Sequence, residues 1–277
     1  MTTSPPANFC NSACAQSALD SVVESFAFGP LELALLTVAG VGAGWINVLA
    51  GGGSLLTVPA MLFLGVPGPI ANGTNRVAVL AQNVVSVVAF ARKGYADFRL
   101  SAGLAAAAGI GAAAGASLGV GLEGVWFNRL VAATMIGVMV LMATDRGGAS
   151  DERDAPSAPK RLVLGYLLMI GAGFWGGLIQ IGVGFLLTPI LFRVMGVDLV
   201  RTAMHKVFIV LIISIVALVI FAANVPIFWA AGAALAIGNA IGGWLGTAAA
   251  IDKGAGFIKK VFLAALGAIV VKLVFFS

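Results

Sequence analysis

The sequence predicts an all-α polytopic membrane protein made of two inverted repeats of about five membrane segments each. Three observations predict it: the composition, a recurring set of apolar segments, and motifs that match between the two halves. Of the 277 residues, 60% are hydrophobic and only 10% are charged, whereas a soluble globular chain carries roughly 25% charged residues. The composition therefore excludes a water-soluble domain, and the lipid bilayer is the expected partner.

The N-terminal residues 1–30 form a polar tail. Its first 25 residues contain no Lys or Arg and no apolar core, which excludes an ordinary signal peptide. The tail holds the two cysteines of the chain, Cys10 and Cys14, and no histidine or further cysteine accompanies them, so we expect no metal site and no cofactor. Most basic residues lie between apolar segments, so they serve as topology markers, and the net charge of +5 predicts no nucleic-acid partner.

Two sets of five apolar segments follow the tail. A polar run of mixed charge at residues 145–161 separates them and is interpreted as a cytoplasmic linker. The first transmembrane repeat is therefore residues 31–144 and the second is residues 162–277. A spanning helix needs about 20 residues, so the second segment of each set is predicted to be short or broken. The segments are residues 31–49, 54–66, 73–91, 100–122 and 125–144, then 162–181, 184–195, 202–223, 225–250 and 257–276.

Matching motifs indicate that the two sets arose by duplication. The stretch LLTVPAMLFLGV, which ends at Val66, matches LLTPILFRVMGV, which ends at Val197. Arg76 and Lys206 are 130 positions apart, and each is followed by valine. Glycines repeat every four residues in the fourth segment of both halves, a pattern typical of close helix packing. These glycines are Gly111, Gly115 and Gly119, and Gly238, Gly242 and Gly246.

Basic residues are placed differently in the two halves. They follow the third segment in the first half and the fourth segment in the second half. The residues concerned are Arg92, Lys93 and Arg99, and then Lys253, Lys259 and Lys260. Because positive loops lie in the cytoplasm, the same loop is predicted inside in one half and outside in the other. The tail, the loop at residues 222–226 and the C-terminus are then outside, and the repeats are inverted. Inverted repeats are typical of alternating-access transporters.

Glycines interrupt the apolar pattern before each short segment. In the first half, Gly51, Gly52 and Gly53 follow one another, and each glycine lowers helix stability by roughly 1 kcal/mol relative to alanine. A break in the helix is therefore predicted at these glycines, and a similar break at Gly182 and Gly184 in the second half. Non-helical backbone at membrane depth survives only where protein or a water-filled cavity covers it, and helix N-termini favour anions. We expect a cavity, with a simple tight turn as the alternative. The candidate residues are Gly52, Gly53 and Ser54 in the first half, and Gly182 and Gly184 in the second.

Arg76 and Lys206 are the candidate charges of an anion site. Each is expected in about the first turn of its segment, and two cations that approach from opposite faces would form one centre for a small anion. Snorkelling to the headgroups is the alternative for each cation. The neighbouring polar residues are Asn72, Thr74, Asn75, Gln82 and Asn83 around Arg76, and Thr202 and His205 around Lys206. Asn72, Thr74, Asn75 and His205 complete the candidate site, although His205 is also open to interpretation as a structural neighbour or a proton relay.

Other motifs carry less information. The GxGxxG match at residues 171–176 lies inside an apolar segment, whereas a dinucleotide fingerprint needs a strand, a turn and a helix. The amides Asn47, Gln180 and Asn239 either face the cavity or bridge helices. No nucleophile–base pair or metal cluster is visible, so an enzyme is not expected. Besides a transporter, an anion channel and a membrane scaffold subunit remain open.

Two long stretches resemble the signatures of the TauE/SafE sulfite exporter family. They are GWINVLAGGGSLLTVPAMLFLGVPGPIANGTNRVAVLAQNVV and GFWGGLIQIGVGFLLTPILFRVMGVDLVRTAMHKVFIVL. The resemblance implies a bacterial inner-membrane permease, usually an exporter, for small sulfur-containing anions such as sulfite or organosulfonates. It carries the family motif onto Asn72, Thr74, Asn75 and Arg76, and onto Lys206 in the second half. His205 stands where the family resemblance implies asparagine or a small polar residue. The sequence leaves the oligomeric state of the protein open, and a homodimer is one of the states that it allows.

Overall fold

The computed structural model describes residues 28–95, 97–122 and 161–276, together with residues 126, 127, 129, 130 and 133. All regular structure in these residues is helical. The predicted tail up to residue 27, most of the segment at 125–144, and the predicted linker as far as residue 160 lie outside the described residues. The predicted all-helical class is confirmed for the part of the chain that is described.

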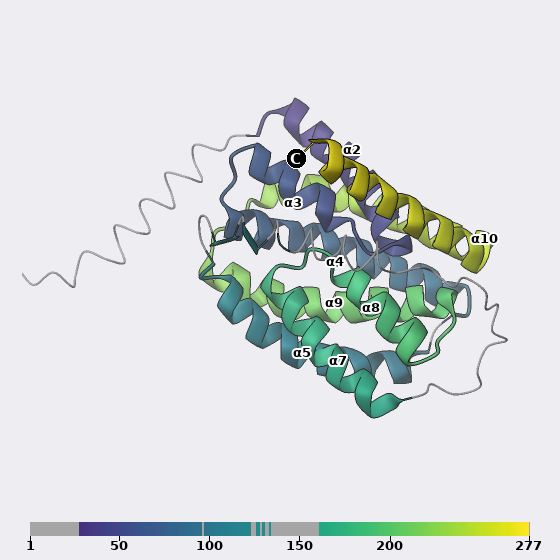
Figure 1. Ribbon diagram of the computed structural model, residues 1–277. Helices are drawn as coiled ribbons and strands as arrows, with labels where there is room; N and C mark the ends of the chain where they lie inside the picture. Colours follow the sequence, from purple (N-terminus) through teal and green to yellow (C-terminus); the bar gives the residue numbers. More distant parts are fainter. Residues whose placement is uncertain are drawn as a thin grey trace, which may run out of the picture.

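The helices follow the predicted segments closely and pack side by side (Figure 1). In chain order they are α2 (Pro30–Leu49), α3 (Ser54–Phe63), α4 (Gly68–Arg92), α5 (Phe98–Gly119), α7 (Leu162–Leu178), α8 (Val183–Pro189), the π-helical turn η1 (Ile190–Val194), α9 (Leu199–Asn224) and α10 (Trp229–Phe276). Among the described residues, five stretches are long and apolar enough to cross a membrane. They are Pro30–Leu49, Gly68–Arg92, Phe98–Gly119, Leu199–Asn224 and Trp229–Gly254. The chain is therefore a multi-pass membrane protein.

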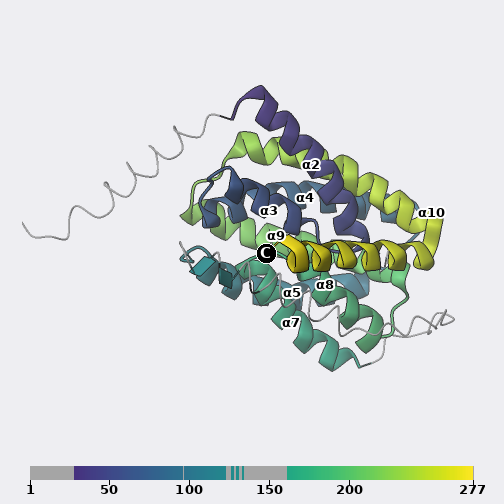
Figure 2. The ribbon, with the colours of Figure 1, turned by 45° about the horizontal axis from the view of Figure 1, so that its top comes forward.

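The second helix of each half is short, as predicted. Helix α3 has 10 residues, and α8 has 7 residues before it continues as the five-residue turn η1. Each contains a proline, Pro59 in the middle of α3 and Pro189 at the end of α8, and a proline removes a backbone hydrogen bond from a helix interior. At the other end of the chain, α10 changes direction at Gly254 (φ 66°, ψ −167°), and its last part runs back across the molecule (Figure 2). It thus supplies the predicted fourth and fifth segments.

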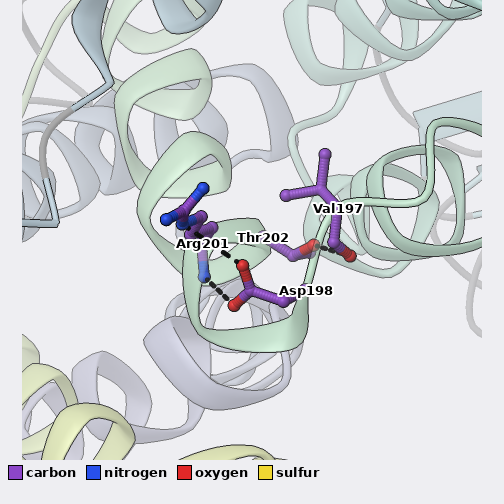
Figure 3. Close-up of polar contacts among 4 residues, drawn as sticks. All are labelled: Val197, Asp198, Arg201 and Thr202. Atoms are coloured by element: carbon purple, nitrogen blue, oxygen red, sulfur yellow. Dashed lines mark hydrogen bonds and ion pairs between the residues drawn. The ribbon is translucent and has the colours of Figure 1, made fainter. Parts of the chain in front are cut away.

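Helix α4 begins five residues earlier than predicted. Pro67 caps it and Pro69 lies in its first turn, where the missing N–H of proline is not needed. Helix α9 also begins early, because the Asp198 side chain caps it by accepting a hydrogen bond from Arg201 N at 2.9 Å (Figure 3). Arg76 and Lys206 therefore lie in the third turn of their helices, and the prediction that they lie in the first turn is wrong.

The glycine repeats place the fourth helix of each half against the first helix of the other half. A Cβ atom on Gly115 would overlap the carbonyl of Phe174 in α7, and one on Gly242 would overlap the carbonyl of Val41 in α2. The predicted role of these glycines in close packing is confirmed. The fourth helix of each half therefore packs on the first helix of the other half, α5 on α7 and α10 on α2.

The equivalent helices α4 and α9 run in opposite directions where they touch. Near the start of α4, the Arg76 guanidinium lies 4.5 Å from the ring centre of Phe221, close to the end of α9. Near the end of α4, Phe90 shares a hydrophobic cluster with Ala203 and Val207, close to the start of α9. Inverted repeats would produce this relation, whereas the orientation of the halves in the membrane stays a prediction.

Candidate functional site

Arg76 binds the C-terminal end of α7. Its Nη1 donates to Gly176 O at 3.1 Å, and its Nη2 donates to Gly177 O and, at 3.5 Å, to Asn72 Oδ1. The last carbonyls of a helix lack partners within the helix and carry partial negative charge. The side chain is fully buried, so it caps a helix inside the protein and does not snorkel outward.

Lys206 makes the equivalent contact in the other half. Its Nζ donates to Val48 O at 2.7 Å, and Val48 lies in the last turn of α2. The residue is 2% exposed. Each cation therefore lies on the third helix of one half and caps the first helix of the other half. This reciprocal capping links the two halves at two separate positions.

The two cations do not form a common centre in this structure. Arg76 touches α9 at Phe221, 15 residues beyond Lys206. That separation is about 22 Å along an α-helix, and the two cations share no hydrogen-bond partner among the described residues. The expected shared centre is therefore replaced by two half-sites, because α4 and α9 cross in opposite directions and carry their cations toward opposite ends of the contact.

The two glycine breaks meet backbone to backbone. A Cβ atom on Gly51 would lie 2.5 Å from Gly184 Cα, and all the predicted break residues are buried. Gly51 and Gly182 have positive φ values of 89° and 73°, which glycine adopts without steric cost. The predicted breaks are present, but protein covers them at this contact. At this contact each break fills the space beside the other, and the cavity stays a prediction.

A network of amides and hydroxyls surrounds the breaks. The Asn75 amide nitrogen donates to Gln180 Oε1 at 3.3 Å and to Ser54 Oγ at 3.4 Å. Thr57 Oγ1 donates to Asn75 Oδ1 at 2.6 Å, and Gln180 Nε2 donates to Ser214 Oγ at 3.1 Å. Asn75 thus contacts both breaks. Gln180, which has the left-handed φ value of 65°, bridges the halves.

The remaining candidate residues have separate contacts. Asn72 Nδ2 donates to Leu178 O at 3.0 Å, next to the carbonyls that Arg76 binds. Thr74 Oγ1 accepts a hydrogen bond from Phe228 N at 3.1 Å, just before α10, and so it supports that helix. His205 Nδ1 lies 2.7 Å from Ser101 Oγ in α5, which favours its interpretation as a structural neighbour. The structure therefore gathers Asn72, Asn75 and Arg76 and leaves Thr74 and His205 with other helices.

Sequence reasoning missed Thr57 and Ser214 as members of this network. Each is a small hydroxyl residue between two apolar neighbours in its helix, and both are buried. Such residues occur in many membrane helices with their hydroxyl bonded to their own backbone, so the sequence carried no signal for a role here. Their partners come from other helices and only the tertiary packing identifies them.

A multi-pass helical fold with buried cations at the junction of two similar halves is typical of membrane transport proteins. Residues 36–273 match the sequence model of the family described as Sulfite exporter TauE/SafE, and the chain belongs to that family. A probable membrane transporter protein, ORF9, from Sinorhizobium sp is 25% identical over 87% of this chain and 92% of the relative. The probable membrane transporter protein YfcA of Escherichia coli (strain K12) is 23% identical over 91% of this chain and 93% of the relative. No solved structure matches the chain. The protein is therefore a membrane transporter.

Proposed function

We propose that the protein is a bacterial inner-membrane exporter, and not an enzyme, of a small sulfur-containing anion such as sulfite or an organosulfonate. One observation carries the proposal: Arg76 and Lys206 are buried and, within the described residues, neither forms an ion pair with a carboxylate. Burying a charge is costly unless it is paired. An anion that occupies the site during transport would compensate that charge, and the family description supports the substrate class and the direction.

The Arg76 half-site has a free donor for such an anion. Its Nε is buried and has no hydrogen-bond partner, although both Nη atoms are bonded. A guanidinium fork suits an oxyanion, because it offers several N–H donors in one plane. Asn72 and Asn75 on the same helix add amide groups. An oxyanion at Arg76 would exchange its water shell for these donors.

The reciprocal capping supports an alternating mechanism. When an anion binds Arg76 or Lys206, it competes with the helix-end carbonyls of the opposite half for the same cation. Binding at one half-site would loosen the contact that holds the first helix of the other half. In inverted-repeat transporters, one repeat rocks against the other around a site at their interface. The antiparallel contact of α4 and α9 agrees with that construction.

Transport is expected to be a uniport driven by membrane potential. Moving one elementary charge through 100 mV is worth about 2.3 kcal/mol, and the bacterial interior is negative, so an anion is pushed outward. In liposomes that contain the purified protein, an imposed potential alone should set the rate and direction of sulfite flux, and His205→Gln should leave the pH dependence unchanged.

Saturation and counterflow would distinguish a transporter from an anion channel. Flux that needs a proton or sodium gradient at zero potential would refute uniport, and the absence of any flux would favour a scaffold subunit.

The membrane topology can be tested in intact cells. The loop at residues 222–226 and the C-terminus are expected outside, and the linker at 145–161 is expected inside, because of the alternating basic loops. In a variant with Cys10 and Cys14 replaced by serine, single cysteines placed in these positions are treated with an impermeant thiol reagent. Labelling is expected in the loop at 222–226 and not in the linker. Labelling of the linker before the cells are opened would contradict the inverted arrangement.

A further inference from the structure

The contact between α4 and α10 contains three buried polar side chains with unpaired atoms. These atoms are Gln82 Nε2, Asn239 Oδ1 and Thr247 Oγ1. Their residues are at most 2% exposed, and most buried polar groups in proteins have a hydrogen-bond partner. We call Gln82, Asn239 and Thr247 the polar seam. Neither the reciprocal capping nor the network at the glycine breaks uses these atoms.

The seam residues lie on facing surfaces of the two helices. A Cβ atom on Gly243 would lie 2.6 Å from Gln82 Cγ, so Gln82 meets α10 at Gly243. Asn239 and Thr247 are four residues before and after Gly243, and residues four apart share one face of a helix. Asn239 and Thr247 therefore lie on the side of α10 that Gln82 meets at Gly243. Asn239 also borders α2, where a Cβ atom on Gly44 would overlap Asn239 O. Ser86 also lies at the α4–α10 contact, but its Oγ is satisfied by Gly243 O at 3.3 Å.

The polar seam lies beside the Lys206 half-site. Gln82 Oε1 accepts from Asn47 Nδ2 at 2.9 Å, and Asn47 precedes Val48, whose carbonyl binds Lys206. At the other end of the seam, a Cβ atom on Gly246 would lie 3.1 Å from Val48 Cβ. Both Gln82 and the residue next to Thr247 therefore border the end of α2 that Lys206 caps.

We propose that the polar seam is the neutral part of the Lys206 anion site. The Gln82 amide and the Thr247 hydroxyl donate hydrogen bonds to the transported oxyanion, Lys206 supplies the charge, and the Asn239 carbonyl, about 12 Å from Thr247 along α10, accepts from water bound to the anion. This inference rests on the proposed function. Neutral donors suit a transport site, because binding must be strong enough for entry and weak enough for release.

The positions that correspond to the polar seam in the other half are apolar, so the seam is present at one half-site only. The third segments match at an offset of 130 positions (206 − 76) and the fourth segments at an offset of 127 (238 − 111). Gln82 therefore corresponds to Ile212, Asn239 to Ala112 and Thr247 to Val120. The Arg76 half-site thus lacks such a seam and has the several donors of a guanidinium instead, together with Asn72. The lysine half-site needs neutral donors because a lysine acts as a point charge. The two half-sites therefore reach the same chemistry by different residues.

The test uses Thr247→Val and Gln82→Glu in the purified full-length protein. Valine has nearly the shape of threonine without the hydroxyl, and glutamate keeps an acceptor for Asn47 while it replaces the amide donor. A thermal-shift screen with sulfite, sulfate, thiosulfate, sulfoacetate and acetate, against chloride at equal ionic strength, selects the anion for titration. Each variant is expected to raise the Kd of that anion by about fivefold or more. The melting temperature of Thr247→Val without anion should not fall, because an unpaired buried hydroxyl is removed.

Ser86→Ala is the matched control, since it removes a seam-facing hydroxyl that already has a protein partner, and its Kd should equal that of the wild type. The seam assignment would be overturned if Thr247→Val and Gln82→Glu bound the anion with unchanged Kd. If Arg76→Met lost anion binding in the same experiment, the proposed function would remain intact. Slower flux with unchanged Kd would also overturn the seam assignment, by indicating a hydrated route without ligand contact. If no anion stabilises the wild-type protein, the proposed function fails together with this inference.

Discussion

Replacing Gly184 by alanine is expected to destabilise the folded state strongly. A Cβ atom at this position would overlap the backbone of Gly51, so the two glycine breaks would have to separate. Overpacking a well-packed interior costs typically about 1–3 kcal/mol and sometimes more, and here the obstacle is backbone, which cannot rotate away. The expected result is loss of the monodisperse peak in size-exclusion chromatography, or a melting temperature lower by several degrees.

Gly171→Ala is the matched control for this experiment. Gly171 lies in α7, and a Cβ atom there would meet no other atom within 4 Å. Alanine is more favourable than glycine in a helix by roughly 1 kcal/mol, so Gly171→Ala should be as stable as the wild type or slightly more stable. A Gly184→Ala protein with wild-type stability would show that the breaks do not touch, and the geometry of the site would need revision.

Removing either buried cation is expected to abolish anion transport and to weaken the fold. Arg76→Ala leaves the end carbonyls of α7 without a donor, and Lys206→Ala does the same to Val48 O at the end of α2. A hydrogen bond to a charged group contributes about 1.5–3 kcal/mol, so the melting temperature should fall as well as the affinity. Arg76→Lys keeps the charge but loses the fork geometry, and it should bind the anion more weakly than the wild type and better than Arg76→Ala.

Arg201→Ala provides the control for charge alone. Arg201 lies on α9 close to Lys206, but its side chain is 58% exposed and paired with Asp198. An exposed ion pair contributes about 0–1 kcal/mol, so transport and anion affinity should be unchanged. The measurements are titration by thermal shift and flux in liposomes. Normal transport by both Arg76→Ala and Lys206→Ala would show that the cations are structural caps only.

Much of the fold could be predicted from the sequence, because apolar composition and segment length constrain a membrane protein strongly. The short second helices, the breaks at the glycine runs and the glycine packing surfaces all followed from local patterns. The beginning of α4 did not. Pro67 precedes it, Pro69 lies in its first turn and small polar residues follow, a pattern typical of a loop when hydrophobicity alone marks the boundary.

The sequence by itself determined that the chain is an all-helical membrane protein, that its halves carry matching motifs, and that Arg76 and Lys206 are the charges to examine. Only the tertiary structure decided what these residues contact. Arg76 binds carbonyls 100 and 101 positions away in the chain, and Lys206 binds one 158 positions away. A local pattern shows that a charge lies in an apolar segment, but its burial and its partner depend on which helices cross and in which direction. The crossing direction of α4 and α9 separates the two cations, and the packing of α10 on α4 and α2 places the polar seam beside the end of α2 that Lys206 caps.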